Sequence, residues 1–206
     1  MRNAWARVSA RFEAYRLVMP GSPRFICQPE VCTAYCCHAY SVSLGDAEVA
    51  RFRHFEGLEP VEFLELDEDS KPIMLPMAEP YVLARQDNHC KMLSPELGCS
   101  AYHGRPNACR LYPHFVVFWD TVEHRAVTIP TDETAAAFDW ARDGHPPPLL
   151  PMLLGHAECP GFTGEPLSEE DWRDLFESTY QLQYEPPSDW PPSRQPESVT
   201  LETEAR

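Results

Sequence analysis

Apolar side chains recur at intervals of three and four near the start of the chain, which predicts an amphipathic helix over residues 4–19. The members of this face are Trp5, Val8, Phe12, Tyr15 and Met19. Pro20-Gly21 ends the pattern. Because such a stripe usually packs against the protein's own core, we expect residues 1–24 to dock as a helix on the domain that follows.

Three further helices are expected from their start and stop signals. The first begins near Asp46 and ends around Gly57, and the second runs from Asp132 to about Arg142. The third is opened by the capping box at 168–171, whose acidic residues suit the first turn of a helix.

Strand patterns are fewer and short. Two apolar runs, 115–119 and 126–129, are separated by a polar turn and predict a β-hairpin. A third short strand is expected at 81–84. The segment 58–80 is acidic and interrupted by prolines, which indicates an excursion over the surface.

Length and composition favour one domain with an appendage. A chain of 206 residues is long enough to bury a core. From residue 186 onward prolines alternate with Ser, Glu and Thr, so we expect 186–206 to be a disordered or extended tail. The domain between the N-terminal helix and this tail would span 25–185.

The charge balance narrows the function. With 17 basic and 32 acidic residues the formal net charge is −15, which argues against nucleic acid and anionic membranes as partners. No apolar run approaches the roughly 20 residues that span a bilayer. The first residues lack the apolar core of a signal peptide, so we expect a cytoplasmic protein.

Eight cysteines are the strongest chemical signal. They form one group of four, a second group of three and a single residue near the end: Cys27, Cys32, Cys36, Cys37, Cys90, Cys99, Cys109 and Cys159. In a reducing cytoplasm such clusters indicate metal binding in place of disulfides, and thiolates select zinc, iron–sulfur clusters or copper(I). The spacing differs from the paired short knuckles of zinc fingers.

The adjacent pair Cys36-Cys37 adds a geometric expectation. Neighbouring side chains point about 100° apart in a helix and to opposite sides in a strand. We therefore expect the two thiols to serve two sites or two metals of one cluster, or one of them not to be a ligand. Eight cysteines would suit two four-thiolate sites.

Two arginines flank Cys109. Pro106 suits the first position of a helix, and Arg105 and Arg110 then lie close to Cys109. Cations lower the pKa of thiols and donate hydrogen bonds to sulfur, so both are candidates for holding a cofactor; the alternative is pairing with surface carboxylates. The nearby histidines (His38, His89, His103 and His114) are not expected to be ligands.

These residues together resemble the YkgJ-type cysteine-cluster family, also described as the CxxCxxCC, putative zinc- or iron-chelating, domain. The resemblance spans about 25 to 161 and is most specific from Cys99 to Pro113. Its motifs are Phe25-x-Cys27, Cys32, Cys36-Cys37, Val42-Ser43-Leu44, Cys90-x-x-Leu93, Cys99-x-x-Tyr102-x-x-Arg105-Pro106-x-x-Cys109-Arg110-x-Tyr112-Pro113 and Cys159-Pro160-Gly161.

The resemblance implies a metal-binding domain holding either zinc or iron. One branch of that family resembles the flagellin lysine N-methylase, which suggests S-adenosylmethionine as a methyl donor, but this chain lacks a glycine-rich nucleotide loop. Signatures of common hydrolases, metalloproteases and P-loop enzymes are absent too.

The fold class expected is therefore α+β, a small irregular domain organised by metal, with short helices and a β-hairpin. We expect all eight cysteines to be metal ligands. The favoured reading is an iron–sulfur cluster such as [4Fe–4S], with a redox, metal-handling or protein-modification role. Two alternatives are a structural zinc protein that acts by binding a protein partner, and a methylase-like enzyme.

Overall fold

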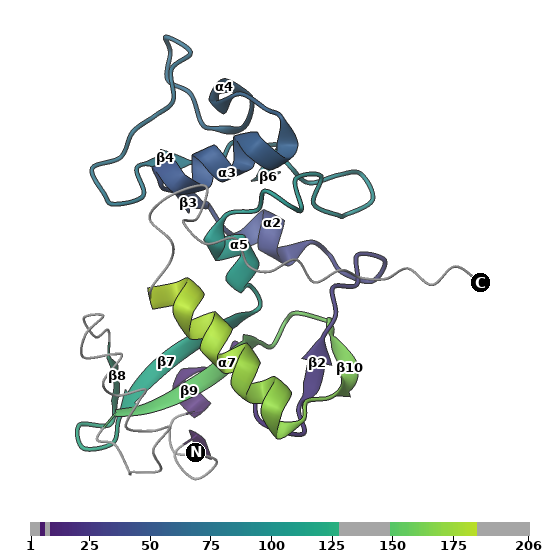
Figure 1. The fold of residues 1–206 in the computed structure, drawn as a ribbon, viewed down its shortest axis with the longest axis vertical. Coiled ribbons are helices and arrows are strands. Elements are labelled where there is room, and N and C mark those ends of the chain that lie inside the picture. The colour runs from purple at the N-terminus through teal and green to yellow at the C-terminus, as the bar shows by residue number, and fades with distance from the viewer. Residues whose placement is uncertain (1–4, 7–8, 128–148, 185–206) are drawn as a thin grey trace.

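The structure is a computed structural model that describes residues 5–6, 9–127 and 149–184. It has two parts, which lie at the two ends of the long axis in Figure 1. The sheet region comprises residues 9–25, 114–127 and 149–184, and the cysteine region comprises residues 27–112. In the described part of the chain, no helix is both long and apolar enough to cross a membrane.

A four-stranded antiparallel sheet forms the frame of the sheet region. Its order is β1 (Tyr15–Leu17), β9 (Leu149–His156), β7 (His114–Asp120) and β8 (Arg125–Val127). β7 and β9 pair along their length, from His114 opposite Gly155 to Asp120 opposite Leu149. β1 adds to the outer edge of β9 and pairs Tyr15 with His156, which is 141 residues away in sequence.

Helix α7 (Glu169–Tyr184) packs against one face of this sheet (Figure 1). Ser168 caps it, because its Oγ accepts a hydrogen bond from the Asp171 backbone N–H at 3.0 Å. At the other end, the Gln183 side-chain amide bonds both the N–H and the C=O of Val116, at 2.7 and 2.9 Å. β8 pairs only with residues 118–120 of β7, so it leaves the backbone N–H and C=O of Val116 without a strand partner. The side chain of Gln183 supplies their hydrogen bonds instead.

A cluster of buried hydrophobic residues fills the space between the sheet and the helix. Its buried members are Val18, Val116, Phe118, Leu153, Cys159, Phe162, Leu167, Phe176 and Tyr180. A second ribbon, β2 (Pro23–Phe25) with β10 (Phe162–Pro166), closes this core (Figure 1). Gly161 allows the ribbon to close, since a Cβ there would meet Phe25 at 2.5 Å and the carbonyl oxygen of Ile26 at 2.6 Å.

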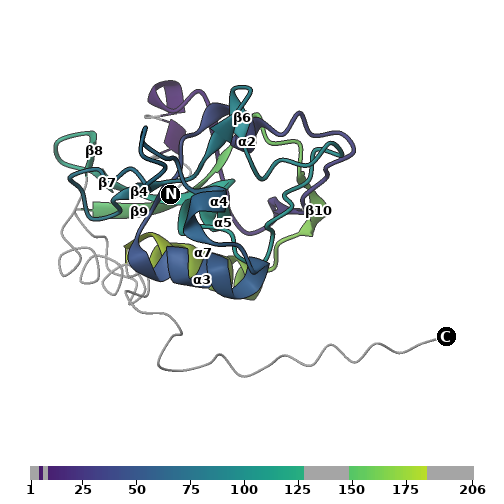
Figure 2. The same ribbon diagram turned by 90° about the horizontal axis from the view of Figure 1, so that it is seen from above.

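The cysteine region is built from shorter elements. Its helices are α2 (Tyr35–Ala39), α3 (Asp46–Glu56), α4 (Pro60–Phe63) and α5 (Asn107–Leu111), and its strands pair in twos: β3 (Ser43–Leu44) with β4 (Tyr81–Val82), and β5 (Arg85–Gln86) with β6 (His89–Cys90). A small core centres on the stacked rings of Phe52 and Phe63, whose centroids are 4.2 Å apart. Seen from above, α3 and α7 lie along one side of the molecule, and α2 and β6 lie toward the other (Figure 2).

Several sequence predictions are confirmed. The fold is a mixed α+β one with short helices and antiparallel hairpins. The helix from Asp46 ends before Gly57, and the capping box at 168–171 opens α7. The hairpin is present as β7 and β8, and the strand expected at 81–84 covers its first two residues.

Two predictions are wrong. The helix expected over 4–19 does not persist, because a short 3-10 turn at Ser9–Arg11 is followed by strand β1 at Tyr15–Leu17. Pairing with β9 outweighs the helical spacing there, although Tyr15 still packs its ring on Phe115. The segment 58–80 is not only a surface excursion, because Phe63 and Leu64 are buried in the core of the cysteine region.

The remaining predictions are not tested by the described residues, and some strands were not expected. The helix expected from Asp132 to about Arg142 and the tail 186–206 lie outside the described residues. Strands β2, β9 and β10 were not predicted. The division of the chain into 1–24, 25–185 and 186–206 stays a prediction.

Candidate metal centre

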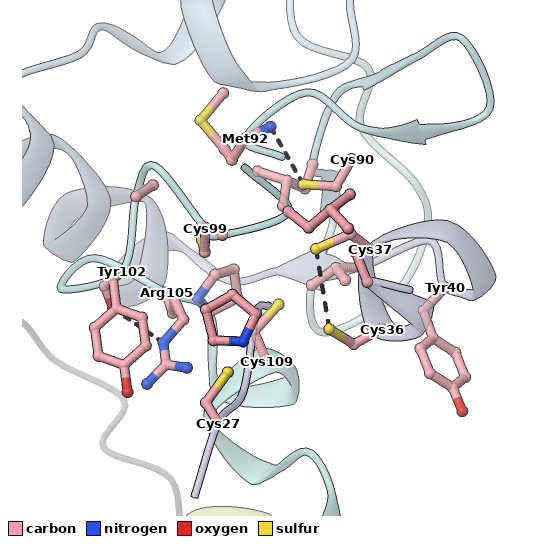
Figure 3. Close-up of a pocket in the computed structure, with 18 of the residues that line it drawn as sticks. Cys27, Cys36, Cys37, Tyr40, Cys90, Met92, Cys99, Tyr102, Arg105 and Cys109 are labelled. Carbon is pink, nitrogen blue, oxygen red and sulfur yellow. Dashed lines mark hydrogen bonds between the residues drawn. The ribbon is translucent and has the colours of Figure 1, made fainter. Parts of the chain in front are cut away.

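Seven of the eight cysteines line one cavity of about 110 Å³ in the cysteine region. They are Cys27, Cys32, Cys36, Cys37, Cys90, Cys99 and Cys109, and all are free thiols. They come from the segment before α2, from α2, from β6, from the loop after β6 and from α5. Figure 3 shows six of them around one space, with Cys27 at its lower rim. The fold therefore brings the first cysteine group (27–37) and the second cysteine group (90–109) to the same cavity.

The first group is shaped by a backbone break just before α2. Ala34 adopts the left-handed conformation with φ 53° and ψ 38°, so Cys32 precedes the helix and does not share a face of it with Cys36. Cys36 and Cys37 occupy the first turn of α2. Their side chains both reach the cavity (Figure 3).

The expectation that the thiols of Cys36 and Cys37 diverge is wrong. Their Sγ atoms are 3.9 Å apart and hydrogen-bonded. Two thiolates on one tetrahedral ion, each about 2.3 Å from the metal, would be separated by roughly 3.8 Å. The spacing of this pair is thus compatible with a single metal atom, because side-chain rotation in the short helix brings the two sulfurs together.

The second group is held by tight turns. The β5–β6 hairpin turns at Asp87 and Asn88, both with positive φ, which are residue types that tolerate that conformation. The turn places Cys90 in β6, where its Sγ accepts a hydrogen bond from the Met92 backbone N–H at 3.4 Å. After β6, an isolated antiparallel β-bridge pairs Leu93 with Cys99, and Cys99 lines the cavity.

Arg85 ties the two cysteine groups together, and sequence reasoning did not single it out. Its guanidinium donates to the carbonyl oxygens of His38 and Tyr40 at the end of α2, and to that of Asn88 in the β5–β6 turn. Arg85 also lines the cavity, where its charge lowers the pKa of Cys90 against the raising effect of burial. Only the tertiary fold brings these carbonyls together, so no local pattern could have identified it.

Helix α3 positions α5 and therefore Cys109. Glu48 accepts a hydrogen bond from the Asn107 backbone N–H at 2.6 Å, and Arg51 donates to the Arg105 carbonyl at 2.8 Å. Farther along α3, Glu56 accepts from the Gly104 N–H at 2.7 Å. Glu48 and Arg51 are 4% and 7% exposed, so this network is buried directly behind the cavity.

The two predicted arginines are placed differently. Arg105 lines the cavity, and its guanidinium lies 3.6 Å from the centroid of the Tyr102 ring while its Nε donates to the Tyr102 carbonyl (Figure 3). Burial raises the pKa of Cys27, Cys99 and Cys109, and the charge of Arg105 opposes that rise; the same charge contributes to the lowered pKa of Cys36. Arg110 does not line the cavity and lies instead in a groove beside α7.

Burial and mutual repulsion dominate the thiol chemistry. Burial raises the pKa of Cys90 and Cys99, and together with the neighbouring thiols it raises the pKa of Cys109 to about 12. The hydrogen bond with Cys37 lowers the pKa of Cys36 to about 7 and raises that of Cys37. Crowded thiols of this kind lose their protons readily only when a cation offsets the repulsion.

Cys159 stands apart from the cavity. It is buried in the core of the sheet region, and the thiols that influence its pKa are Cys32 and Cys27. Burial raises the pKa of Cys159, and an interaction with the Tyr112 hydroxyl opposes that rise; burial likewise raises the pKa of Tyr112. The close approach of Gly161 to Phe25 brings this cysteine near the first group.

None of the four histidines near the cysteines lines the cavity. The rings of His38 and His89 meet each other, with centroids 5.5 Å apart. His114 is buried between Phe25 and Phe162 in the sheet region, and burial lowers its pKa to about 4.

The donor set suits a soft metal. No carboxylate or imidazole is among the described residues that line the cavity, and its two charged members, Arg85 and Arg105, can offset thiolate charge. Across the described residues, no three Cys, His, Asp or Glu side chains converge on one point at metal-binding distance. The cavity volume of about 110 Å³ exceeds the roughly 10–15 Å³ that one water molecule requires.

A site of clustered cysteines in an irregular α+β frame defines a thiolate metal-binding domain. The family model described as CxxCxxCC, putative zinc- or iron-chelating domain, matches residues 26–139, a little over half of the chain. The chain therefore belongs to this family, and Cys159 lies beyond the matched range. Comparison with curated proteins and with solved structures finds no match.

Proposed function

We propose that the cysteine cavity holds a polynuclear iron–thiolate centre, an iron–sulfur cluster. The observation that carries this proposal is that seven thiols line one cavity. A single tetrahedral ion binds four ligands, so a centre that uses more of these thiols needs more than one metal atom. Iron–sulfur clusters are held by cysteine thiolates and take several iron atoms.

The chain's own residues would bind, orient and balance such a centre. When bound, an iron–sulfur cluster supplies one-electron redox chemistry. The α2 and β6 thiols would be held in place by Arg85, and Cys109 by the hydrogen bonds from α3. Arg85 and Arg105 would offset the negative charge of the thiolates. Cys27 is exposed at the rim, which suits a redox or metal-handling role, since its sulfur can be reached from solvent.

Elemental analysis tests this proposal. Protein purified without oxygen is assayed for iron, zinc and acid-labile sulfide. We expect more than one iron atom per chain, with sulfide in comparable amount. Zinc without sulfide would overturn the iron–sulfur proposal.

A zinc centre is the second candidate, and one distance favours it. The 3.9 Å between the Cys36 and Cys37 sulfurs is close to the separation of two thiolates on one tetrahedral ion. In that case the metal would complete the small core of the cysteine region. Zinc at one or two atoms per chain, without visible absorption, would support this candidate.

Single Cys→Ser variants then test the ligand set. We expect Cys36→Ser and Cys37→Ser to lose the same amount of metal, because their sulfurs lie close enough to share one atom. Cys27→Ser, at the exposed rim, should lose less than Cys109→Ser. Metal loss in Cys36→Ser with full retention in Cys37→Ser would contradict the shared atom.

Cys159→Ser tests the eighth predicted ligand. Cys159 does not line the cavity, although the thiols of Cys32 and Cys27 and the hydroxyl of Tyr112 influence its pKa. If it is a ligand, as the sequence predicts, Cys159→Ser lowers the metal content while Tyr112→Phe changes the spectrum without metal loss. Full metal content in Cys159→Ser would remove it from the ligand set.

A further inference from the structure

A second concave site lies beside α5 and shares Arg105 with the cysteine cavity. It is a groove of about 570 Å³ between α5 and the C-terminal half of α7. Its lining contains two guanidinium groups, those of Arg105 and Arg110, and the side-chain amide of Gln181. The apolar wall is made by Leu111, Leu175 and Leu182.

The charge of this groove is unusual for the protein. The whole chain has 17 basic against 32 acidic residues, yet no carboxylate is among the described residues that line the groove. Arg105 and Arg110 bring two positive charges into this one groove. An arrangement of two arginines without an acid stabilises a bound anion and is destabilising without one.

The arginines also have donors to spare. Arg105 uses its Nε on the Tyr102 carbonyl and is held flat against the Tyr102 ring, which fixes the direction of its fork. Within the described part of the chain, the Arg110 guanidinium makes no hydrogen bond or ion pair. Glu48 on α3 already accepts hydrogen bonds from the backbone N–H groups of Gly45 and Asn107 and pairs with Arg51.

From these observations we infer that the groove between α5 and α7 binds the oxyanion group, phosphate or carboxylate, of a small molecule. The guanidinium forks of Arg105 and Arg110 bind the oxyanion from two sides, and Gln181 supplies a further N–H donor at the rim. The hydroxyls of Ser178 and Thr179 donate to the Leu175 carbonyl, so they shape the wall and do not bind the anion.

Arg105 joins this groove to the metal centre. It lines both concavities, so an anion in the groove lies one side chain away from the cysteine thiols. The anion site itself does not depend on the identity of the metal. Only the coupling between the two sites rests on the proposed function.

The experiment is a titration of the metal-loaded full chain with inorganic phosphate and, separately, with acetate, at constant ionic strength set by sodium chloride. Binding is followed by isothermal calorimetry and by backbone amide shifts in α5 and α7. We expect saturable binding of one or both oxyanions and shifts confined to the groove. Arg110→Gln should weaken binding roughly ten- to a hundredfold, as expected for losing charge-assisted hydrogen bonds.

The matched control is Arg173→Gln. Arg173 lies on α7 outside the groove, with an exposed side chain paired to Glu169. This variant should bind the oxyanion as tightly as the unaltered chain. Equal binding by Arg110→Gln, or no saturable binding by the unaltered chain, overturns the proposal. Neither result depends on the iron or sulfide content, so the two proposals fail separately.

Discussion

The two regions of this molecule reach stability by different means. The sheet region has long elements: β7 has seven residues, β9 has eight and α7 has sixteen, and they enclose a continuous core. The strands of the cysteine region have two residues each, and α2 and α5 have five. Cys90, Cys99 and Cys109 pack against its small core. From this contrast we expect burial to suffice for the sheet region and metal to be needed to complete the interior of the cysteine region.

Metal removal should have the largest effect and should separate the two regions. Anaerobic chelation should lower the melting temperature substantially, since binding of structural metal contributes on the order of 10 kcal/mol in small domains. All tryptophans lie outside the cysteine region, so tryptophan fluorescence reports on the rest of the chain. We expect amide signals of 27–112 to collapse first while the tryptophan signal persists. An unchanged melt would show that the cysteines are incidental to the fold.

A pair of matched substitutions sharpens the contrast. Phe118 and Phe63 are both 0% exposed, one in each region. Each Phe→Ala change should cost about 3–5 kcal/mol of unfolding free energy. We expect Phe118→Ala to keep its metal affinity and Phe63→Ala to lose part of it, because only Phe63 packs in the core beside the thiols. Equal metal affinity in both variants would contradict the division into regions.

Acid should weaken the sheet region through His114. Burial lowers the pKa of this histidine from 6.5 to about 4, so the unfolded chain binds a proton more readily than the folded one between these values. Stability present above pH 6.5 is therefore lost as the pH falls toward 4, by roughly 3 kcal/mol. His114→Phe should remove this part of the pH dependence, as its neighbours are aromatic rings. Denaturant unfolding of both proteins at pH 7 and pH 4.5 makes the comparison, and parallel losses in the two would exclude His114 as the cause.

We expect the smallest loss of stability from substitution of Arg85, because its hydrogen bonds connect only α2 and the β5–β6 turn within the cysteine region. Arg85→Gln removes charge-assisted hydrogen bonds to the end of α2 and should cost about 1–3 kcal/mol. Metal affinity should fall with it, because the α2 thiols lose their tether to the hairpin of Cys90. Arg125→Gln, which breaks only an exposed ion pair with Glu123, is the control and should change neither quantity. A competition titration with a chelator measures both variants, and equal affinities would leave Arg85 without a role in the site.

Local signals account for the elements that sequence reasoning found. The cap at Ser168, the stop at Gly57 and the two apolar runs of the hairpin each act within a few residues. Strand β9 has no such signal: it is continuously apolar and contains Pro151 in its middle. Apolar runs of that length do not distinguish a buried strand from a helix. β1 depends wholly on β9, which explains the wrong helix at its position.

The site was predictable in its ligands and not in its surroundings. The sequence predicts all eight cysteines as ligands; seven of them line the cavity, and their role as ligands stays a prediction. Arg85, Glu48 and Tyr112 act on groups between 45 and 59 residues away, so only the folded chain reveals them. The short distance between the Cys36 and Cys37 sulfurs was not predicted either, because the average side-chain directions in helices and strands point neighbouring residues apart.

The place of the cavity in the chain has a consequence for biosynthesis. Cys27 to Cys109 all lie between β1 and β7, while β9, the partner of both strands, is made only after residue 148. The ribosome therefore delivers a complete set of cavity thiols before the sheet can close. Pairing of β1 with β9 spans 141 residues, and such long-range contacts form slowly. We therefore expect metal that reaches the nascent chain at this stage to fold the cysteine region first, so that the sheet assembles afterwards around a folded insert.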